Sequence, residues 1–281
     1  MILYKYASAS SAIRILEEMR LKVVLPNECN DPFEFTPRSR MTITKGYWLH
    51  KVHTDPEHFL PVYDKLVSEG FKPSFSEFLR ALPETIETRY GEIRKLFRDN
   101  LVQNDLSARD EASLFAGILC LSAPNDSIPM WAHYGNEHKG VAVGIRKDDP
   151  AFSRGQSGRV RYVKHRCSVD PLLAADTQPW WNQIYRTIFS KNLDWNYEKE
   201  FRILFRLGDL VTGKLKDGRK GYFVDVWGST IDSVIVGCQI SPEDAIAIRS
   251  LLTSSKRFSH VKKLRALRHP KSFSLQIAPD S

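Results

Sequence analysis

The sequence lacks any long apolar run: none approaches the roughly 18 residues that a helix needs to span a bilayer. Its first ten residues, MILYKYASAS, also lack the basic region and apolar core of a secretory signal. We therefore expect a soluble, cytoplasmic protein with no membrane partner.

Two common motifs are missing as well. The four cysteines are far apart and form no C-x-x-C pair, which in 281 residues argues against both a disulfide framework and a zinc knuckle. We expect reduced, mostly buried thiols at Cys29, Cys120, Cys167 and Cys238. No G-x-G-x-x-G is present, which argues against a dehydrogenase.

Acidic residues are absent between Lys256 and Lys271, and this segment carries seven of the eight net positive charges. The basic residues are Lys256, Arg257, Lys262, Lys263, Arg265, Arg268 and Lys271. Such a patch suits contacts with nucleic-acid phosphates. The alternative is a solvated sheet edge whose lysines discourage aggregation.

What is present is enough for a large core, since 42% of the residues are hydrophobic and 11% aromatic. The chain opens with a β-α-β pattern: the strand ILYKY, the helix SSAIRILEEMR capped by Ser10 or Ser11, and the strand LKVVLP, which Pro26 ends. Residues 56–116 have helical spacing throughout and predict a helical insertion, either a substrate-contacting lid or a plain packing element.

From Gly117 onward the chain is rich in short strands bounded by Gly, Pro, Asn or Asp. A helix capped by Ser241 follows DSVIVG, and the strands HVKKLRAL and FSLQI predict a terminal hairpin. Together these patterns predict one α+β domain over residues 1–281, with a mixed, largely antiparallel sheet and the helical insertion at 56–116.

Three short segments carry the candidate chemistry. SIPMWAHYGNEHKG mixes large rings with hydrogen-bonding side chains within ten residues, which suits a ligand-binding loop around Trp131, His133 and Tyr134. The alternative is a helical turn that packs Met130, Trp131 and Tyr134 under the sheet. Zinc ligation by His133 and His138 is less favoured, because no further ligand lies at a recognisable spacing.

In DWNYEKEFRILF, a strand would place Glu198, Glu200 and Arg202 on one face, because strand side chains alternate with period two. Such a row is either a solvated edge or a site where Arg202 orients one carboxylate and the other meets a developing positive charge.

In CNDPFEF, polar residues surround Pro32 and Phe33. One interpretation is a cleft rim anchored by Phe33, in which Asn30, Asp31 and Glu34 offer hydrogen bonds to a substrate. The other is a rigid Asx turn that holds Glu34 against Arg202 or Lys139.

In this order, the blocks LYKY, NDPFE, ILCLS, MWAHYGNEHKGVAVGI, RVRY and WNYEKEFR resemble a family of bacterial proteins catalogued only as a domain of unknown function. More distantly, LYKY…SAIRILEEMRLKVV resembles the start of bacterial toxins that ADP-ribosylate nucleic acid. The pair Glu198 and Glu200 resembles the E-x-E element of ADP-ribosyltransferases.

The second resemblance implies an ADP-ribosyltransferase-like split sheet with NAD bound in its cleft as a substrate. Glu200 would be the catalytic glutamate and Glu198 its substrate-orienting neighbour. The residues expected to bind NAD are Tyr4, Lys5, Asn30, Asp31, Trp131, His133, Tyr134 and Arg202. The implied function is a toxin or phage-defence effector that modifies RNA or DNA, bound through residues 256–271, with an antitoxin or chaperone protein as a candidate partner.

Two other functions fit the same residues. A metal-dependent nuclease could use Asp31, Glu34, Glu198 and Glu200 as ligands of a hard cation. A binding module without chemistry would use the aromatic and basic surfaces to hold nucleic acid or a protein.

Overall fold

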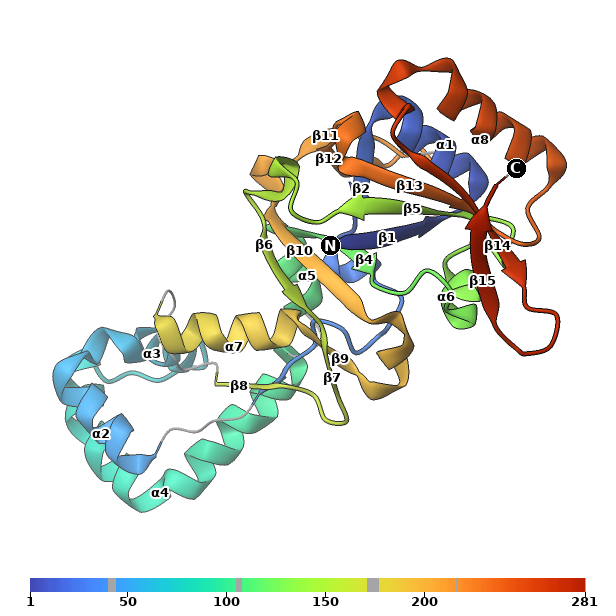
Figure 1. The fold of residues 1–281 in the computed structure, drawn as a ribbon. Coiled ribbons are helices and arrows are strands. Elements are labelled where there is room, and N and C mark those ends of the chain that lie inside the picture. Colours follow the sequence, from blue (N-terminus) through green and yellow to red (C-terminus); the bar gives the residue numbers. More distant parts are fainter. Residues whose placement is uncertain (40–43, 105–107, 171–176, 216, 281) are drawn as a thin grey trace. The chain divides into compact units, whose positions relative to one another are not determined.

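The computed structural model describes residues 1–39, 44–104, 108–170, 177–215 and 217–280 (Figure 1). The chain divides into two compact units. The sheet unit comprises residues 1–35, 109–166 and 188–281, and the helical unit comprises 36–108 and 167–187.

The sheet unit is built on an eight-stranded sheet with the order β15-β14-β13-β5-β1-β4-β10-β6. Its strands are β1 (Ile2–Ala7), β4 (Ala116–Ser122), β5 (Val141–Arg146), β6 (Gln156–Arg159), β10 (Glu200–Arg206), β13 (Ile231–Val236), β14 (Lys262–Arg268) and β15 (Leu275–Pro279). Neighbouring strands are antiparallel except β13 and β14, which run parallel. The prediction of a mixed, mostly antiparallel α+β fold is confirmed.

Smaller pieces flank this sheet. Strands β11 (Val211–Lys214), β12 (Lys220–Asp225) and β2 (Arg20–Val23) form a three-stranded sheet in that order. Strands β7 (Arg161–Val163) and β9 (Ser190–Asn192) pair in parallel. Short 3-10 helices connect them, among them η1 (Pro26–Glu28), η4 (Leu193–Glu198) and η7 (Lys256–Phe258).

The main sheet opens between β1 and β4. Strand β1 pairs with β5 from Ile2 to Ala7, but it pairs with β4 only at Tyr4, opposite Ser122. Beyond that point the ammonium group of Lys5 donates a hydrogen bond to the carbonyl of Cys120, at 3.2 Å, where a ladder bond would otherwise be. The gap leaves room for a cavity between two neighbouring strands.

Helices cover both faces of the sheet (Figure 1). Helices α1 (Ala9–Glu18) and α8 (Pro242–Ser254) pack on one face, and α6 (Ile128–His133) lies on the other. Ser241 caps α8 as predicted, by accepting a hydrogen bond from the backbone of Asp244. The cap of α1 is Ser8 rather than Ser10 or Ser11, because the extended backbone of Ser8 lets its hydroxyl accept from the Ser11 amide.

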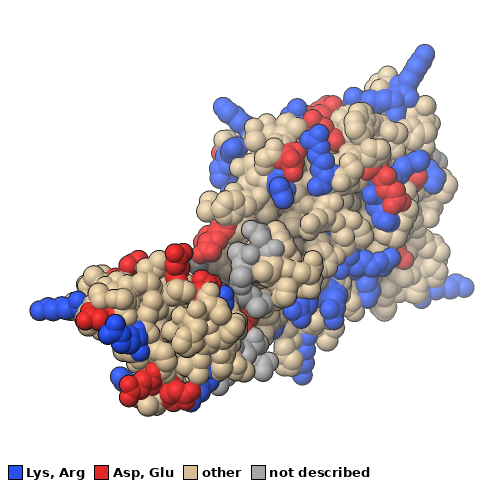
Figure 2. Space-filling view, turned by 90° about the vertical axis from the view of Figure 1, so that its left-hand side faces the viewer, with Lys and Arg blue, Asp and Glu red and all other residues tan. Residues whose placement is uncertain are grey.

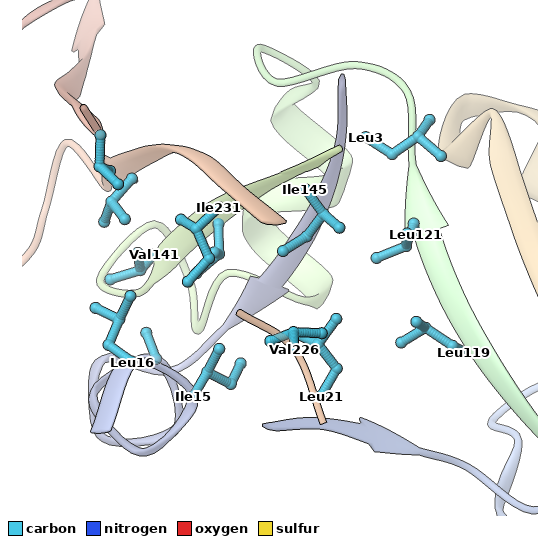
Figure 3. Close-up of a cluster of buried hydrophobic side chains, with 14 of the residues drawn as sticks. Leu3, Ile15, Leu16, Leu21, Leu119, Leu121, Val141, Ile145, Val226 and Ile231 are labelled. Carbon is cyan, nitrogen blue, oxygen red and sulfur yellow. The ribbon is translucent and has the colours of Figure 1, made fainter. Parts of the chain in front are cut away.

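The largest core of the sheet unit lies under α1 and α8. Figure 3 shows Leu3, Ile15, Leu16, Val141, Ile145 and Ile231 converging there from β1, α1, β5 and β13. A second buried cluster, on the opposite face, contains Tyr6, Met130, Trp131, Ala142, Ile235, Ala266 and Leu275. The sheet is therefore packed on both sides, which explains the continuous apolar runs of β5 and β13.

The helical unit has its own apolar core. Its helices are α2 (Lys45–Thr54), α3 (Leu60–Ser68), α4 (Phe75–Asn104) and most of α7 (Gln178–Ile188), while α5 (Ala108–Ser113) starts at its boundary. Their buried side chains include Trp48, Val52, Phe59, Phe78 and Ile86. A two-stranded parallel sheet of β3 (Arg38–Ser39) and β8 (Ser168–Val169) completes it.

Within the predicted insertion 56–116, the described residues form η2 (Pro56–Phe59), α3, α4 and α5, with a non-helical connection at 69–74. Strand β4 begins at Ala116, and residues 105–107 lie outside the described part. Whether this segment acts as a lid stays a prediction. No described helix is long and apolar enough to cross a membrane.

Helix α8 offers a matched test of the core. Ile248 is buried, whereas Ile246 on the same helix is 60% exposed. Ile248→Ala should lower the free energy of unfolding by about 2–5 kcal/mol, because it leaves a cavity under the sheet. Ile246→Ala removes the same atoms from the surface and should change it by roughly 0.5 kcal/mol or less. Urea unfolding of both variants checks the difference; equal losses would contradict this packing.

Candidate functional site

A cavity of about 400 Å³ lies at the opening between β1 and β4, within the sheet unit. Seven of the residues predicted for a site line it, namely Tyr4, Lys5, Asn30, His133, Tyr134, Glu198 and Glu200. Glu34, Lys191, Cys29 and Cys120 also line it. Its size is within the range of small-ligand sites, and it brings together segments that are far apart in the sequence, from Tyr4 to Glu200.

A cluster of five charged side chains forms one wall of the cavity and the structure behind it. We call Glu34, Lys191, Glu198, Glu200 and Arg202 the charge cluster. All five are buried, and Arg202 is 0% exposed. Because isolated charges are costly to bury, each member depends on its partners.

Lys191, on β9, is the centre of the charge cluster. Its ammonium nitrogen lies 2.8 Å from a carboxylate oxygen of Glu34, 2.8 Å from one of Glu198 and 3.6 Å from one of Glu200. The same nitrogen lies 4.7 Å from the ring centroid of Trp195. One cation therefore holds three carboxylates that arrive from separate segments.

Arg202 anchors the cluster from within the sheet. Its guanidinium binds both oxygens of Glu200, at 2.9 and 3.0 Å, and donates to Glu34 at 2.5 Å. A third contact goes to the carbonyl of Ile188 at 2.6 Å, and the group lies over the ring of Phe35. This bidentate geometry makes Glu200 the most firmly held carboxylate of the three.

The backbone places the two glutamates of E-x-E differently. Glu198 ends η4, Lys199 has a left-handed backbone with φ 44°, and β10 begins only at Glu200. The prediction that Glu198, Glu200 and Arg202 share one strand face is therefore wrong for Glu198. Glu200 and Arg202 do share a face of β10, while the turn at Lys199 directs Glu198 separately toward the cavity.

Glu198 has a second set of partners on the cavity side. The hydroxyl of Tyr134 donates to its other carboxylate oxygen at 2.7 Å, and Asn30 donates to that hydroxyl at 2.9 Å. Next to them, His133 Nδ1 is 2.8 Å from the hydroxyl of Tyr197. Asn30 and Tyr134 thus lead to Glu198 rather than Glu200, and His133 lines the same cavity.

The environment separates the pKa values of the two glutamates. Burial and the nearby charge of Glu200 raise the pKa of Glu198 to about 7, even though Lys191 and Tyr134 oppose the shift. For Glu200, burial would raise the pKa, but the charge and hydrogen bonds of Arg202 outweigh it and lower the pKa to about 2. Glu200 stays ionised at neutral pH, and Glu198 can take up or release a proton.

The thiols and Lys5 contribute differently to the cavity. Burial raises the pKa of Cys29 to about 12 and raises that of Cys120, so both stay protonated and unreactive at neutral pH. Burial lowers the pKa of Lys5. All four cysteines are free, as predicted, although each is only half-buried.

The turn after α6 is strained. Asn136, Glu137 and His138 all have left-handed backbones, with φ of 48°, 55° and 66°, which non-glycine residues seldom adopt. Backbone hydrogen bonds hold the turn, from His138 N to the Trp131 carbonyl and from Gly140 N to the Gly135 carbonyl. A strained backbone persists only where the surrounding structure holds it in place. Here these hydrogen bonds hold the turn against α6, the helix that carries His133 next to the cavity.

Three of the predicted site residues do not line the cavity: Trp131, Arg202 and Asp31. Trp131 is 0% exposed: its ring packs edge-on against Tyr6 and its indole N–H donates to the Asn125 carbonyl, so it cannot stack on a ligand. This confirms the alternative in which Met130 and Trp131 pack under the sheet. Arg202 is buried, bound to Glu200, and does not line the cavity.

Asp31 is also buried, and its Oδ1 accepts from the backbone of Phe33. This is the Asx turn of the second interpretation, and the predicted pair of Glu34 with Arg202 is confirmed. Phe33 is 59% exposed and does not anchor the turn; Phe35 is the buried ring. Asp31 Oδ2 has no hydrogen-bond partner among the described residues.

The charge cluster also bears on the metal alternatives. The ammonium of Lys191 stands among Glu34, Glu198 and Glu200, where a hard cation would have to bind. Asp31 lies outside this set, since its only described carboxylate contact is within its own turn. Across the described residues, no group of His, Cys, Asp and Glu has the arrangement of a metal site. The geometry disfavours the nuclease.

Sequence reasoning missed Lys191, the residue on which three carboxylates converge. It precedes Glu198 by seven residues, and no periodicity marks it. A lysine in a short strand, four residues before Trp195, was the only available signal.

The basic segment 256–271 does not form one patch. Alternation along β14 sends Lys263 and Arg265 to the face opposite that of Lys262 and Arg268. Arg265 pairs with Asp280 and Lys262 with Asp232, while Arg257 donates to the Leu16 carbonyl. Over the face that Figure 2 shows, lysine and arginine side chains lie among aspartate and glutamate side chains.

Comparison with known proteins gives one match. Residues 130–203 match a family model described as "Protein of unknown function (DUF2971)". This range contains the turn after α6 and four members of the charge cluster, namely Lys191, Glu198, Glu200 and Arg202. No curated protein and no solved structure matches the chain.

The raised pKa of Glu198 predicts a pH-dependent stability. Its ordinary value is 4.5, so the folded state holds the proton more tightly, and its contribution to stability is full below about 4.5 and lost as pH rises to about 7. The loss is on the order of 3 kcal/mol. Glu198→Gln should therefore flatten the decline in unfolding free energy between about pH 5 and 7.

Urea unfolding at a series of pH values measures this slope. Glu137→Gln is the matched control, because Glu137 is exposed and its pKa is lowered by Lys139, so its titration falls below this window. A slope unchanged by Glu198→Gln would show that Glu198 does not hold a proton at neutral pH.

Proposed function

We propose that the cavity is the active site of an NAD-dependent ADP-ribosyltransferase-like enzyme that modifies nucleic acid. The observation that carries the proposal is the charge cluster at the cavity wall, in which three carboxylates face two cations. When Glu198 is ionised, the cluster has one negative charge in excess; when Glu198 is protonated, it is neutral.

An excess carboxylate in a water-poor cavity suits cleavage of a glycosidic bond. As the bond from ribose C1′ to the nicotinamide nitrogen breaks, its electron pair stays with nicotinamide, and positive charge develops on the ribose. Glu198 would stabilise that charge across the cavity. A nucleophile on the nucleic acid then bonds to C1′, and its proton passes to Glu198. The proton and electrons balance without a metal or redox partner.

The two glutamates take roles opposite to those implied by the resemblance. Glu200 is already neutralised by the bidentate contact with Arg202 and by Lys191, so its charge is not available to a substrate. It is a positioning residue that holds Lys191 and Arg202 in place. Glu198, with its pKa of about 7 and its face on the cavity, is the candidate catalytic residue.

Aromatic side chains would hold the flat nicotinamide. Tyr4, His133 and Tyr134 line the cavity, and Tyr134 is fixed by its bond to Glu198. Tyr134 therefore replaces the buried Trp131 as the candidate stacking ring. The opening between β1 and β4 agrees with a cleft in a split sheet, and the role of toxin or phage-defence effector follows from the same resemblance.

Nicotinamide release from NAD, measured with single-stranded RNA or DNA present, tests the proposal. Glu198→Gln keeps the shape and removes the excess charge, so turnover should fall about a hundredfold or more while NAD still binds. Glu137→Gln should turn over normally. Wild-type protein that neither binds nor consumes NAD would leave the binding-module function as the better description.

The pH profile of turnover is a separate prediction. Because the cluster gains its excess negative charge only when Glu198 loses its proton, the rate should rise as pH increases through about 7. Tyr134→Phe removes a hydrogen bond that favours the ionised carboxylate, so the midpoint of the rise should move to higher pH. Turnover that is constant between about pH 5 and 9 would exclude Glu198 from this role.

A further inference from the structure

A second hollow lies beside the hairpin that joins β14 to β15. It measures about 460 Å³ and is lined by residues that include His138, Arg268, His269, Lys271 and Phe273. The described residues lining it include no aspartate or glutamate. We call this hollow the hairpin groove.

Two cations of the hairpin groove are not paired with any described acidic side chain. Arg268 and Lys271 are exposed, and neither forms an ion pair with a described acidic side chain. On the same strand, Lys262 and Arg265 are paired with Asp232 and Asp280. The groove therefore offers a local positive charge that the protein does not neutralise itself.

Phe273 stands at the tip of the hairpin with its side chain fully exposed. The turn that carries it is held from within. His269 Nδ1 accepts hydrogen bonds from the backbone of Lys271 and Ser272, at 3.2 and 3.0 Å, and lies 2.8 Å from the Ser272 hydroxyl. The His269 amide also donates to the Ser274 carbonyl. The ring is thus presented by a preorganised turn.

We propose that the hairpin groove binds single-stranded nucleic acid, with an unpaired base stacked on Phe273 and phosphates at Arg268 and Lys271. An exposed ring next to free cations matches the way such strands are held, because every base has a face that can stack. A duplex hides those faces. The inference rests on the proposed function, to which it adds the surface that receives the acceptor.

The position of the groove supports this role. Ile128, at the start of α6, lines the hairpin groove, whereas Met130 and His133 of the same short helix line the cavity of the charge cluster. Met130 and Trp131 pack with Leu275 of β15, so the hairpin and α6 form one packed body. A nucleic-acid strand bound at Phe273 would therefore lie on the same face of the sheet as the cavity.

Fluorescence anisotropy with a labelled single strand of about 12 nucleotides tests the groove. Phe273→Ala should weaken binding about tenfold, and Phe273→Trp should retain it. Phe273→Leu separates stacking from plain apolar contact: it should weaken binding as much as alanine does. Retained affinity in the leucine variant would show that base stacking does not hold the nucleic acid, and it would overturn the inference.

Substitutions at the two cations of the hairpin groove test the contribution of charge. Arg268→Gln and Lys271→Gln should each weaken binding and reduce the slope of log affinity against log salt by roughly one. Phe115→Ala and Lys214→Gln are matched controls, because both residues are exposed on other parts of the sheet unit, and neither should change binding. Duplex bound as tightly as single strand, with the same dependence on Phe273, would overturn the inference.

Two further readouts separate this inference from the proposed function. If wild-type protein does not consume NAD yet loses single-strand binding with Phe273→Ala, the groove stands and the transferase fails. If Phe273→Ala consumes NAD and transfers as much label to the nucleic acid as the wild-type protein does, the groove fails and the transferase stands. Sedimentation that changes in Phe273→Ala, with affinity unchanged, would assign the tip to self-association and overturn the inference.

Discussion

The burial of five charged side chains is the constraint on which the site depends. Removing a charged residue from water costs several kcal/mol unless partners replace the lost hydration. Lys191 and Arg202 supply those partners, and they reach three carboxylates that come from the segment after β2, from η4 and from β10. These ion pairs therefore fix the positions of the segments around the cavity. Moving any one of them would leave a buried charge without a partner.

The same constraint explains how the sheet tolerates an opening. An interrupted ladder between β1 and β4 leaves backbone groups that need other partners. Lys5 satisfies the Cys120 carbonyl, and farther along β4 the backbone of Ile118 pairs with that of Val24, just after β2. A side chain and this backbone bridge thus replace pairing with β1 at the gap, and the space between the strands becomes available to a ligand.

Much of the fold could be predicted from the sequence, whereas the site could be predicted only in part. Strand periodicity and the Ser241 cap are local signals, and they predicted β13, α8 and the terminal hairpin. The Asx turn could be predicted because adjacent residues encode it. The partner of Glu34 was left as either Arg202 or Lys139, because that contact is distant in sequence. Trp131 could not be placed in this way, because its burial depends on Tyr6, which is distant in sequence.

The predictions of a shared strand face for Glu198 and of a single basic patch at 256–271 were wrong for two other physical reasons. A single left-handed residue, Lys199, cancelled the strand alternation on which the shared face depended. In segment 256–271, charge was counted along the chain, but a strand distributes neighbouring residues to opposite faces. Lys191 was missed because ion pairing over long sequence separations leaves no periodic trace.

The left-handed backbone of Lys199 restricts which sequences can carry this site. With φ of 44°, the middle position of E-x-E suits glycine, asparagine or an unbranched side chain, while valine or isoleucine there would meet steric conflict. A chain with E-V-E or E-I-E would instead continue the strand and turn its first glutamate away from the cavity. Among distant relatives, the residue between the two glutamates should therefore distinguish chains that can assemble this charge cluster from chains that merely contain the motif.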